Sequence, residues 1–518
     1  MSNSCFHLAS HTETVELLRG IVGKPNVLTD VEDLYVYSFE QIHRERHPQE
    51  ILAVVRTDKA EEIKKVAKVT KERGYSLVPR GRIHGFNNSS NPIIMLDDHE
   101  QLDLKPYEKP EEPHSDDVKE FHEAESGTLK KLALARRLLF LDRPASKCED
   151  CRICSSYCTV ASSFNGVETW SAKGRMLLMR AIARRELPIS PKILDVLYTC
   201  SNCGLCFAEC LQRSELQEAI RAARRQVVVE GHTPDMLKAT ARNILEVGDP
   251  GRTSPKQRFS WLEKVPTPHL KEKADILYWV GCTSGVRTPK TAKAVSNILG
   301  ASGSDFALLG REEGCCGYVL IASGLWDDAR KNAKNVAEKV ARVKAETMVT
   351  SCAGCYYTFS KLYPEILDVE VPCEVLHTSQ LIEDLMNEGI LDVAGVDKRV
   401  TFHDPCSLGR HAGVYDAPRN VLKRIPKLQL VEMSLSKDRA RCCGGGGGLW
   451  SYNNRVSMNS AWNRLTKDVA PLNVSALATA CPTCQMNLRY ASIRNSFPIH
   501  VCDLAEIAEM AMVNAANS

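Results

Sequence analysis

Hydrophobic and polar positions in the first hundred residues predict a small α/β unit. Residues 51–55 form a short apolar run typical of a buried strand. A second apolar run covers residues 76–78. Between them, apolar residues recur at helical spacing at Ala60, Ile63 and Ala67. We therefore expect a strand–helix–strand unit within residues 1–107.

The C-terminal half contains an internal repeat, in which matching cysteines are 124 to 129 residues apart. Apolar strands at 276–280 and 400–402 open the two copies, and a helical stretch at 326–345 lies inside the first. In each copy, a vicinal cysteine pair follows, and a later strand ends in C-x₂-C. This alternation predicts two Rossmann-like units, 270–390 and 396–518, with their cysteines at strand ends, where open α/β sheets bind ligands.

Two further segments separate these units. Residues 108–125 carry eight acidic residues and two prolines without periodicity, as in a solvated linker. Residues 126–265 combine helical patterns with eight clustered cysteines. The chain of 518 residues is long enough for several domains of this size.

Composition and charge narrow the class of protein. The 67 Lys and Arg residues nearly balance the 64 Asp and Glu residues, so no strong field favours a nucleic-acid partner. The N-terminus lacks a signal-peptide pattern, and the best apolar run, 319–326, is too short to span a bilayer. We expect a cytoplasmic protein. Its 21 cysteines then indicate metal ligands rather than disulfides.

Two identical motifs in residues 126–265 indicate ferredoxin-type clusters. Each has the spacing C-x₂-C-x₂-C-x₃-C: Cys148, Cys151, Cys154 and Cys158, then Cys200, Cys203, Cys206 and Cys210. In two-cluster ferredoxins, the fourth cysteine of each run binds the other cluster. We therefore expect one cubane [4Fe–4S] cluster on Cys148, Cys151, Cys154 and Cys210, and another on Cys200, Cys203, Cys206 and Cys158.

Structural zinc is the competing interpretation of these motifs. Zinc favours C-x₂-C pairs separated by a dozen or more residues, so a threefold C-x₂ spacing that occurs twice favours the cubanes. Thr159 and Leu211 stand where bacterial ferredoxins have proline. Proline supplies no ligand, so the departure leaves the prediction intact. Two adjacent cubanes would conduct single electrons.

Each C-terminal repeat supplies five thiols, one more than a cubane needs. The site is therefore either an unusual cluster or a cubane with one cysteine left over. Five glycines, 444–448, follow Cys443 and predict a close-packed cluster or substrate loop, with a flexible linker as the alternative.

Both repeats resemble the CCG domain of the heterodisulfide reductase family. The segment from Phe402 to Arg419, with 441–448, is similar to the family's D-type catalytic subunit, and the likeness covers about residues 130 to 510. It implies two noncubane [4Fe–4S] clusters that cleave a small-molecule disulfide between them. By position, one cluster would be held by Cys282, Cys315, Cys316, Cys352 and Cys355, and the other by Cys406, Cys442, Cys443, Cys481 and Cys484.

The architecture also resembles the iron–sulfur subunit of FAD-dependent glycolate and lactate dehydrogenases. In that alternative the chain is an electron wire without catalysis of its own. Those relatives often have incomplete CCG motifs, whereas both copies here are complete. Completeness favours the disulfide reductase interpretation. An interaction scaffold without turnover is a third possibility.

Residues 48–98 resemble the opening lobe of the FAD-binding domain of flavin-dependent hydroxyacid dehydrogenases. The turn at 82–88 has fewer glycines than that family's pyrophosphate loop, and the remainder of the flavin domain is missing. We expect no FAD in this chain, and interpret the lobe as a remnant or docking module; completing a flavin site with a partner is the alternative. The kinship implies a flavoprotein or other electron-donor subunit, or a membrane cytochrome or quinone-linked partner that would hold the protein at the membrane.

The expected fold class is thus multidomain α/β plus α: a truncated α+β flavin-domain-like lobe, a helical two-cluster ferredoxin-type domain and two tandem Rossmann-like CCG repeats. Some residues near the clusters have open roles. His377 and His403 are either packing histidines or proton donors, and Arg410 and Arg441 could neutralise a substrate or the clusters. Three cysteines without partners at ligand spacing are expected to be plain thiols: Cys5, Cys373 and Cys502.

Overall fold

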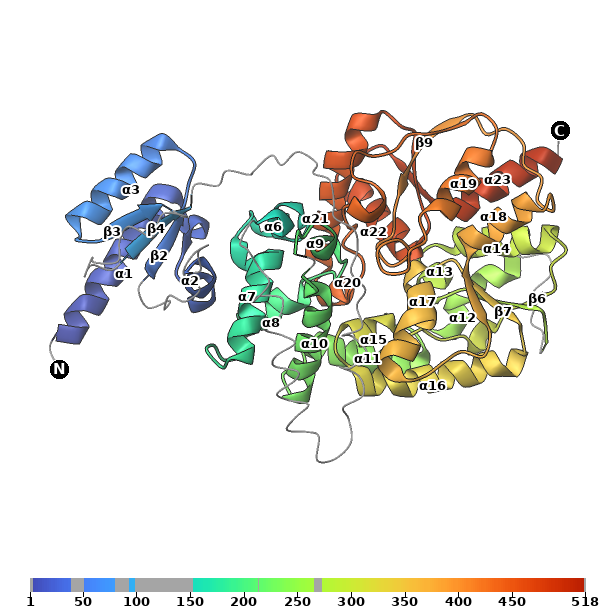
Figure 1. Ribbon diagram of the computed structural model, residues 1–518, viewed down its shortest axis with the longest axis horizontal. Helices are drawn as coiled ribbons and strands as arrows, with labels where there is room; N and C mark the ends of the chain where they lie inside the picture. Colours follow the sequence, from blue (N-terminus) through green and yellow to red (C-terminus); the bar gives the residue numbers. More distant parts are fainter. Residues whose placement is uncertain are drawn as a thin grey trace.

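The chain folds into four parts that follow one another in sequence. The computed structural model describes residues 3–38, 51–79, 93–97, 152–212, 214–264 and 273–516. Figure 1 shows an N-terminal α/β lobe, a helical segment beside it, and two α/β units that form the larger body. The expected turn at 82–88, with Cys148 and Cys151, lies outside the described residues.

The N-terminal lobe is a four-stranded sheet in the order β1-β2-β4-β3. Only β1 is antiparallel to its neighbour. The lobe's strands and helices are β1 (Val27–Leu28), β2 (Ile51–Arg56), β3 (Ser76–Pro79), β4 (Ile93–Asp97), α1 (Asn3–Val22), α2 (Val31–Tyr37) and α3 (Ala60–Glu72). The two strands predicted here are confirmed as β2 and β3, and the helix as α3.

The buried face of α3 differs from the face that its apolar spacing indicated. Ala60 and Ala67 are exposed, whereas Val66 and Thr70 are buried. Ile63 lies half-buried between the two faces. Alanine is small enough to be common on helix surfaces, so its spacing is a poor indicator of which side packs inward.

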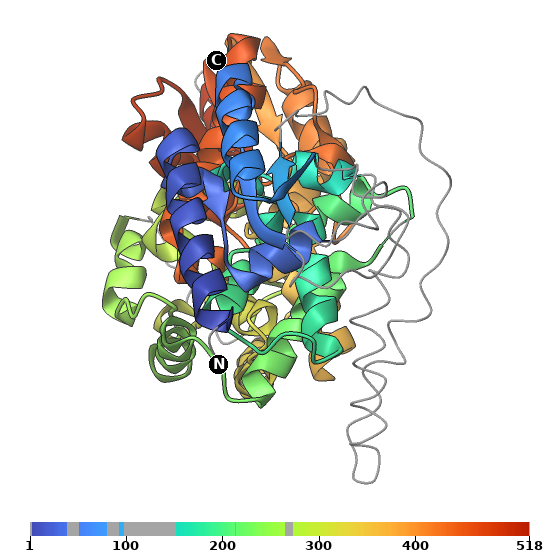
Figure 2. The same cartoon turned by 90° about the vertical axis from the view of Figure 1, so that its left-hand side faces the viewer.

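The two faces of the lobe's sheet pack against different partners. Helices α1 and α3 cover one face with a small apolar cluster of their own, and Figure 2 shows them in front of the sheet. The opposite face carries α2 and continues into the core of the helical segment. Polar contacts reinforce this second interface: Lys192 Nζ lies 2.6 Å from an Asp33 carboxylate oxygen, and Thr169 Oγ1 donates to Asp33 at 2.5 Å.

The helical segment covers residues 152–264, where Ser-Pro pairs begin two helices. Ser190 and Ser254 each accept a backbone N–H of the first turn, with proline at the first helical position. Its helices are α6 (Ile153–Tyr157), α7 (Ala172–Ala183), α8 (Pro191–Tyr198), α9 (Leu205–Ala208), α10 (Leu216–Val229), α11 (Asp235–Val247) and α12 (Pro255–Arg258), with short turns at Ala161–Phe164, Glu168–Trp170 and Ser260–Lys264.

The first C-terminal unit has a fully parallel sheet in the order β6-β5-β7-β8. Its strands are β5 (Ile276–Trp279), β6 (Phe306–Ala307), β7 (Thr347–Thr350) and β8 (Glu374–His377). Its helices are α13 (Cys282–Val286), α14 (Pro289–Ala301), α15 (Tyr318–Ala322), α16 (Trp326–Val343), α17 (Ala353–Tyr357) and α18 (Thr378–Asn387), with a turn at Gly310–Glu312 and a π-helical segment at Thr358–Leu367.

The second unit repeats the same parallel topology, in the order β10-β9-β11-β12. Its strands are β9 (Lys398–His403), β10 (Leu428–Leu430), β11 (Ala476–Thr479) and β12 (His500–Asp503). Its helices are α19 (Asp416–Arg424), α20 (Leu449–Tyr452), α21 (Asn454–Arg464), α22 (Pro482–Arg494) and α23 (Leu504–Ala516), with further turns at Lys437–Arg439, Leu465–Val469 and Ala470–Leu472. The internal repeat and its strands are thereby confirmed.

Strand order determines where each unit can bind a ligand. The order reverses between β5 and β7 in the first unit, and between β9 and β11 in the second. In open parallel sheets, ligands bind at the carboxyl ends of the two strands that flank such a reversal. The first cysteine and the C-x₂-C pair of each repeat follow these strands. No helix in the described part of the chain is long and apolar enough to cross a membrane.

Candidate iron–sulfur centres

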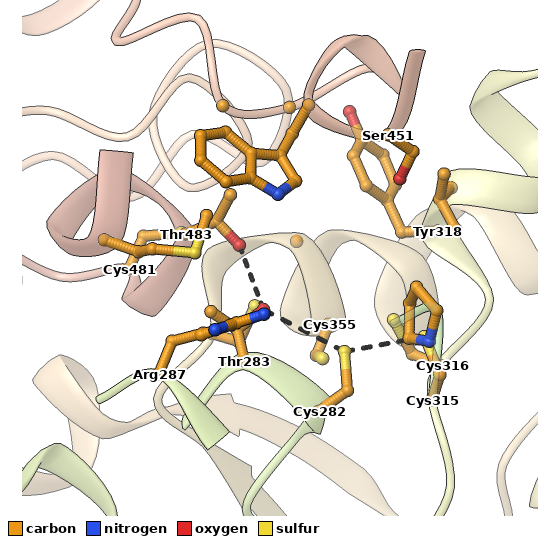
Figure 3. A pocket seen from close by; sticks show the side chains of 18 of the residues that line it. Cys282, Thr283, Arg287, Cys315, Cys316, Tyr318, Cys355, Ser451, Cys481 and Thr483 are labelled. Carbon is orange, nitrogen blue, oxygen red and sulfur yellow. Dashed lines mark hydrogen bonds between the residues drawn. The ribbon is translucent and has the colours of Figure 1, made fainter. Parts of the chain in front are cut away.

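The five cysteines of the first repeat come from three chain segments that meet at the end of its sheet. Cys282 begins α13, the vicinal pair precedes α15, and Cys352 and Cys355 flank the start of α17. Cys282 Sγ lies 3.7 Å from Cys315 Sγ (Figure 3). Cys316 contacts both Cys315 and Cys355. The structure therefore brings all five thiols of this repeat into one contiguous group.

The second repeat gathers its five cysteines in the same way. Cys443 Sγ lies 3.2 Å from Cys484 Sγ. Cys442 contacts Cys406 and Cys443, and Cys481 contacts Cys484. Four of these five residues are buried, and Cys406 is half-buried.

The thiols influence one another's protonation. In the first repeat, hydrogen bonds from Cys315 and then Cys355 lower the pKa of Cys316 well below its usual range. In the second, Cys442 and then Cys484 do the same for the pKa of Cys443. Each vicinal pair thus favours one thiolate, the form of cysteine that binds metal.

The donor sets fit iron–sulfur clusters. Every cysteine that the structure describes in full is a free thiol, with no disulfide among them. Clusters are held by convergent cysteine thiolates, and both groups offer convergent free cysteines. Five thiols per repeat also exceed the four that a cubane or a structural zinc site takes.

A cavity of about 380 Å³ lies between the two repeats. Both thiol groups line it, and Cys352 of the first repeat contacts Cys481 of the second. Thr283 Oγ1 lies 3.5 Å from Thr483 Oγ1 across the two repeats (Figure 3). The wall is mainly apolar, and its charged residues are Arg287 and Asp249.

The cysteines of the helical segment also converge. Cys158 lies among Cys200, Cys203 and Cys206, which belong to the other motif. Cys210 shares a second small cavity with Cys154 and Cys206. Cys158 thus lies with the second run, whereas Cys210 lies near a cysteine of each run. Cys148 and Cys151 are outside the described residues, so the second group is seen only in part.

The helical segment meets the second repeat directly through cysteine. Contact with Cys442, followed by burial, raises the pKa of Cys203 well above its usual range. Arg410 links the two loops: its Nε donates to Cys203 O at 2.8 Å, and its Nη1 donates to Asp438 O at 3.0 Å and Ala440 O at 2.6 Å. His411 Nε2 lies 3.0 Å from the carbonyl of Asn202.

Comparison with known proteins shows the family to which the chain belongs. A family model described as a cysteine-rich domain, CCG, matches residues 276–360 and 400–489. The D-type subunit of the dihydromethanophenazine:CoB–CoM heterodisulfide reductase of Methanosarcina barkeri is 31% identical over 384 residues, which cover 70% of this chain and 93% of that protein. The chain belongs to the family of this heterodisulfide reductase subunit.

Two other relatives share parts of the chain. A probable membrane-anchored ferredoxin of Chromohalobacter salexigens is 36% identical over 267 residues, or 49% of this chain and 39% of that protein. The B-type subunit of the CoM/CoB fumarate reductase of Methanothermobacter marburgensis is 29% identical over 319 residues, covering 61% of each chain. Of these three likenesses, the one to the heterodisulfide reductase subunit extends over almost the whole of the relative.

The five-glycine run of this family member is a close-packed loop, as predicted, rather than a linker. A Cβ on Gly447 would lie 2.2 Å from Ser201 O, and one on Gly444 would lie 2.7 Å from Ser457 O. Arg224 fixes the same contact, since its Nη1 donates to Gly447 O at 2.7 Å and its Nη2 to Cys200 O at 2.6 Å. The run therefore lets the second repeat approach the helical segment.

The sequence left the roles of several residues near the sites open. Arg441 Nη1 pairs with Asp468 at 2.6 Å, and the same carboxylate lies 2.8 Å from Arg464 Nη1. His377 is a packing histidine, with Nδ1 2.9 Å from Ser379 Oγ and Nε2 3.2 Å from Ser351 O. Arg224 was missed entirely, because a lone arginine in a helix carries no local signal. Cys373 and Cys502 are free thiols, half-buried and buried, and the side chain of Cys5 is not among those that the structure describes.

Proposed function

We propose that this chain is the disulfide-reducing subunit of a heterodisulfide reductase-like complex. It is an iron–sulfur oxidoreductase of the family named above, with a small-molecule disulfide as the proposed substrate. The cavity lined by thiols of both repeats carries this proposal. A partly open, mainly apolar cavity with a few polar groups is typical of a small-molecule site.

Four groups of cysteines would hold four [4Fe–4S] clusters, two of them cubane and two noncubane, which supply one-electron transfer when bound. The cubanes would be held by Cys148, Cys151, Cys154 and Cys210, and by Cys158, Cys200, Cys203 and Cys206. The noncubane clusters would be held by Cys282, Cys315, Cys316, Cys352 and Cys355, and by Cys406, Cys442, Cys443, Cys481 and Cys484.

The placement of these groups suits a two-electron reaction. Reduction of a disulfide takes two electrons and two protons, and it breaks one sulfur–sulfur bond to give two thiols. Cys352 and Cys481 meet between the repeats, so a disulfide in the cavity would present one sulfur atom to each repeat. This explains why the site is duplicated.

The chain's own residues bind and shield the substrate in this proposal. The Thr283 and Thr483 hydroxyls offer hydrogen bonds at the centre of the cavity. Arg287, exposed at the wall, would orient an anionic group. The apolar wall excludes water from the thiolates, which strengthens electrostatic interactions there.

Partner subunits would deliver the electrons. The relatives named above include subunits of a heterodisulfide reductase and of a fumarate reductase. A flavoprotein is the proposed donor, because the N-terminal lobe resembles part of a flavin domain; a membrane cytochrome or quinone-linked partner would serve the same role and hold the protein at a membrane.

Anaerobic reoxidation tests the proposal. Reconstituted full-length protein is reduced with dithionite, and disulfides are added while the iron–sulfur absorbance is followed. Disulfide-dependent reoxidation, with two thiols formed per disulfide, is expected. Reoxidation by no disulfide, together with co-purification of a flavoprotein that oxidises a 2-hydroxyacid, would instead make the chain an electron wire.

A matched pair of glycine variants connects that activity to the cavity. Gly446 lines the cavity, and a Cβ there would have its nearest neighbours at 3.9 Å, so Gly446→Leu fills space without a backbone clash. Gly300→Leu on α14 adds the same side chain where no atom lies within 4 Å. We expect the first to lose reoxidation and the second to keep it, with equal iron content.

A further inference from the structure

His403 differs from the other buried histidine near the thiol groups. His377, at the end of β8, has both ring nitrogens within hydrogen-bond distance of Ser379 and Ser351. His403 ends β9, with 1% of its surface exposed. Neither of its ring nitrogens has a hydrogen-bond partner in the described part of the chain. A buried donor without a partner destabilises the folded state, so this ring needs an acceptor.

Two thiols lie beside this ring, and among the described residues they are the side chains of a metal-ligating type that gather there. A ring nitrogen of His403, Cys443 Sγ and Cys484 Sγ lie within 4.8 Å of one another. The strand end is held in place, since Thr479 Oγ1 donates to His403 O at 3.1 Å. The backbone of His403 is therefore anchored beside the second repeat's thiols.

The first repeat has a different residue at this place. Register aligns Trp279 with Thr350 in the first sheet, and His403 with Thr479 in the second. Trp279 packs edge-on against Phe359, with ring centroids 5.1 Å apart. The two repeats thus share a fold but differ in the side chain beside the thiols.

We propose that His403 is a positioning residue that donates an N–H hydrogen bond to the Cys443 thiolate of the loaded second repeat. The consequence is a higher reduction potential at this site, because a donor to a ligating sulfur stabilises the more negative, reduced state. This rests on the proposed function, since it assumes that the second repeat holds an iron–sulfur cluster. A neutral imidazole suffices, as one of its nitrogens always carries hydrogen.

A direct iron–nitrogen bond is the competing arrangement, since histidine replaces cysteine at some clusters. The two differ in how strongly the nitrogen couples to the cluster's electron spin.

The first experiment uses the wild-type chain. Protein labelled with ¹⁵N-histidine is reconstituted, reduced and studied by pulsed EPR. We expect a weak nitrogen coupling of the kind that a hydrogen bond to sulfur gives. A strong coupling typical of an iron–nitrogen bond would overturn the proposal, and so would no coupling at all.

The second experiment compares variants by EPR-monitored redox titration without any disulfide present. His403→Phe removes the donor and should shift one cluster signal to a more negative midpoint potential and abolish the weak nitrogen coupling. His403→Gln retains a donor and should restore part of the shift. His377→Gln is the matched control and should leave all potentials unchanged.

A failure of this proposal can be distinguished from a failure of the proposed function. Unchanged potentials in His403→Phe with full iron content would overturn the role of His403, even if disulfides reoxidise the protein. An absence of disulfide-dependent reoxidation, with the shift present, would overturn the proposed substrate instead. If His403→Phe fails to retain iron, His403→Gln and the labelled wild type decide.

Discussion

The two C-terminal repeats have the same strand order but face different neighbours. Cys282 and Cys406 occupy equivalent positions after β5 and β9. The fourth and fifth residues after them are Val286 and Arg287 in one repeat, and Arg410 and His411 in the other. The first pair lines the cavity. The second pair bonds to the helical segment. The two repeats thus use the same scaffold for different contacts, and the residues at these two adjacent positions determine which contact each repeat makes.

Removing Arg410 should have the largest effect on this difference. Arg410→Gln withdraws the donors to three carbonyls, including Cys203 O. We expect the opening free energy of residues 200–206, measured by amide hydrogen exchange, to fall by about 3–5 kcal/mol, because buried carbonyls lose their partners. The control is Arg399→Gln, whose exposed side chain makes only a 3.4 Å bond to Leu472 O. Equal protection in both variants would contradict the linking role of Arg410.

A substitution in the five-glycine run should have the second largest effect. Gly447→Ala places a Cβ 2.2 Å from Ser201 O at a φ of +63°. Overpacking and backbone strain together should lower stability at this contact by about 2–4 kcal/mol, read by the same exchange experiment. Gly413→Ala has a φ of +78° but no atom within 4 Å, so it isolates the backbone strain. If both variants lose the same stability, close approach is not the reason for the glycine.

Acid should weaken the same interface. Burial, followed by Arg221 and Arg410, lowers the pKa of His411 to about 4. The unfolded state takes up a proton near pH 6.5 that the folded state excludes, so stability is complete above that pH and lost as pH falls toward 4. We expect a loss of about 1–3 kcal/mol in wild type over this window. The variant His411→Gln should lack that part of the slope in acid unfolding curves.

Substitution of Arg287, the residue of the first repeat that is equivalent to His411, should have the smallest effect on stability. Arg287 is exposed, so Arg287→Gln should change stability by less than about 0.5 kcal/mol in thermal unfolding. It should instead raise the KM for an anionic disulfide relative to a neutral one. A KM increase of the same size for both substrates would show that Arg287 does not select charge.

Local patterns in the sequence predicted the strands and the cysteine groups, but not how the groups meet. Each repeat's thiols follow strand ends, which an apolar run and a nearby cysteine suffice to reveal. The contact of Cys203 with Cys442 joins residues in different units, and the bond from Arg224 to Gly447 does the same. No periodicity encodes such pairs, because they depend on how two finished surfaces dock. The role of His403 also stayed open, since the thiols beside it follow much later in the chain.

The interface of the N-terminal lobe has a consequence for how the chain can be divided. Tyr35 and Tyr37 of α2 are buried, and their hydroxyls bond to Glu186 and to the backbone N–H of Glu168. Arg56 Nη2 donates to Asn165 O at 2.6 Å across the same boundary. A chain that lacked the lobe but kept Cys148 and Cys151 would expose an apolar surface and lose these hydrogen bonds. The lobe therefore stabilises the helical segment that it covers, and its deletion should lower the solubility of the protein before it lowers the iron content.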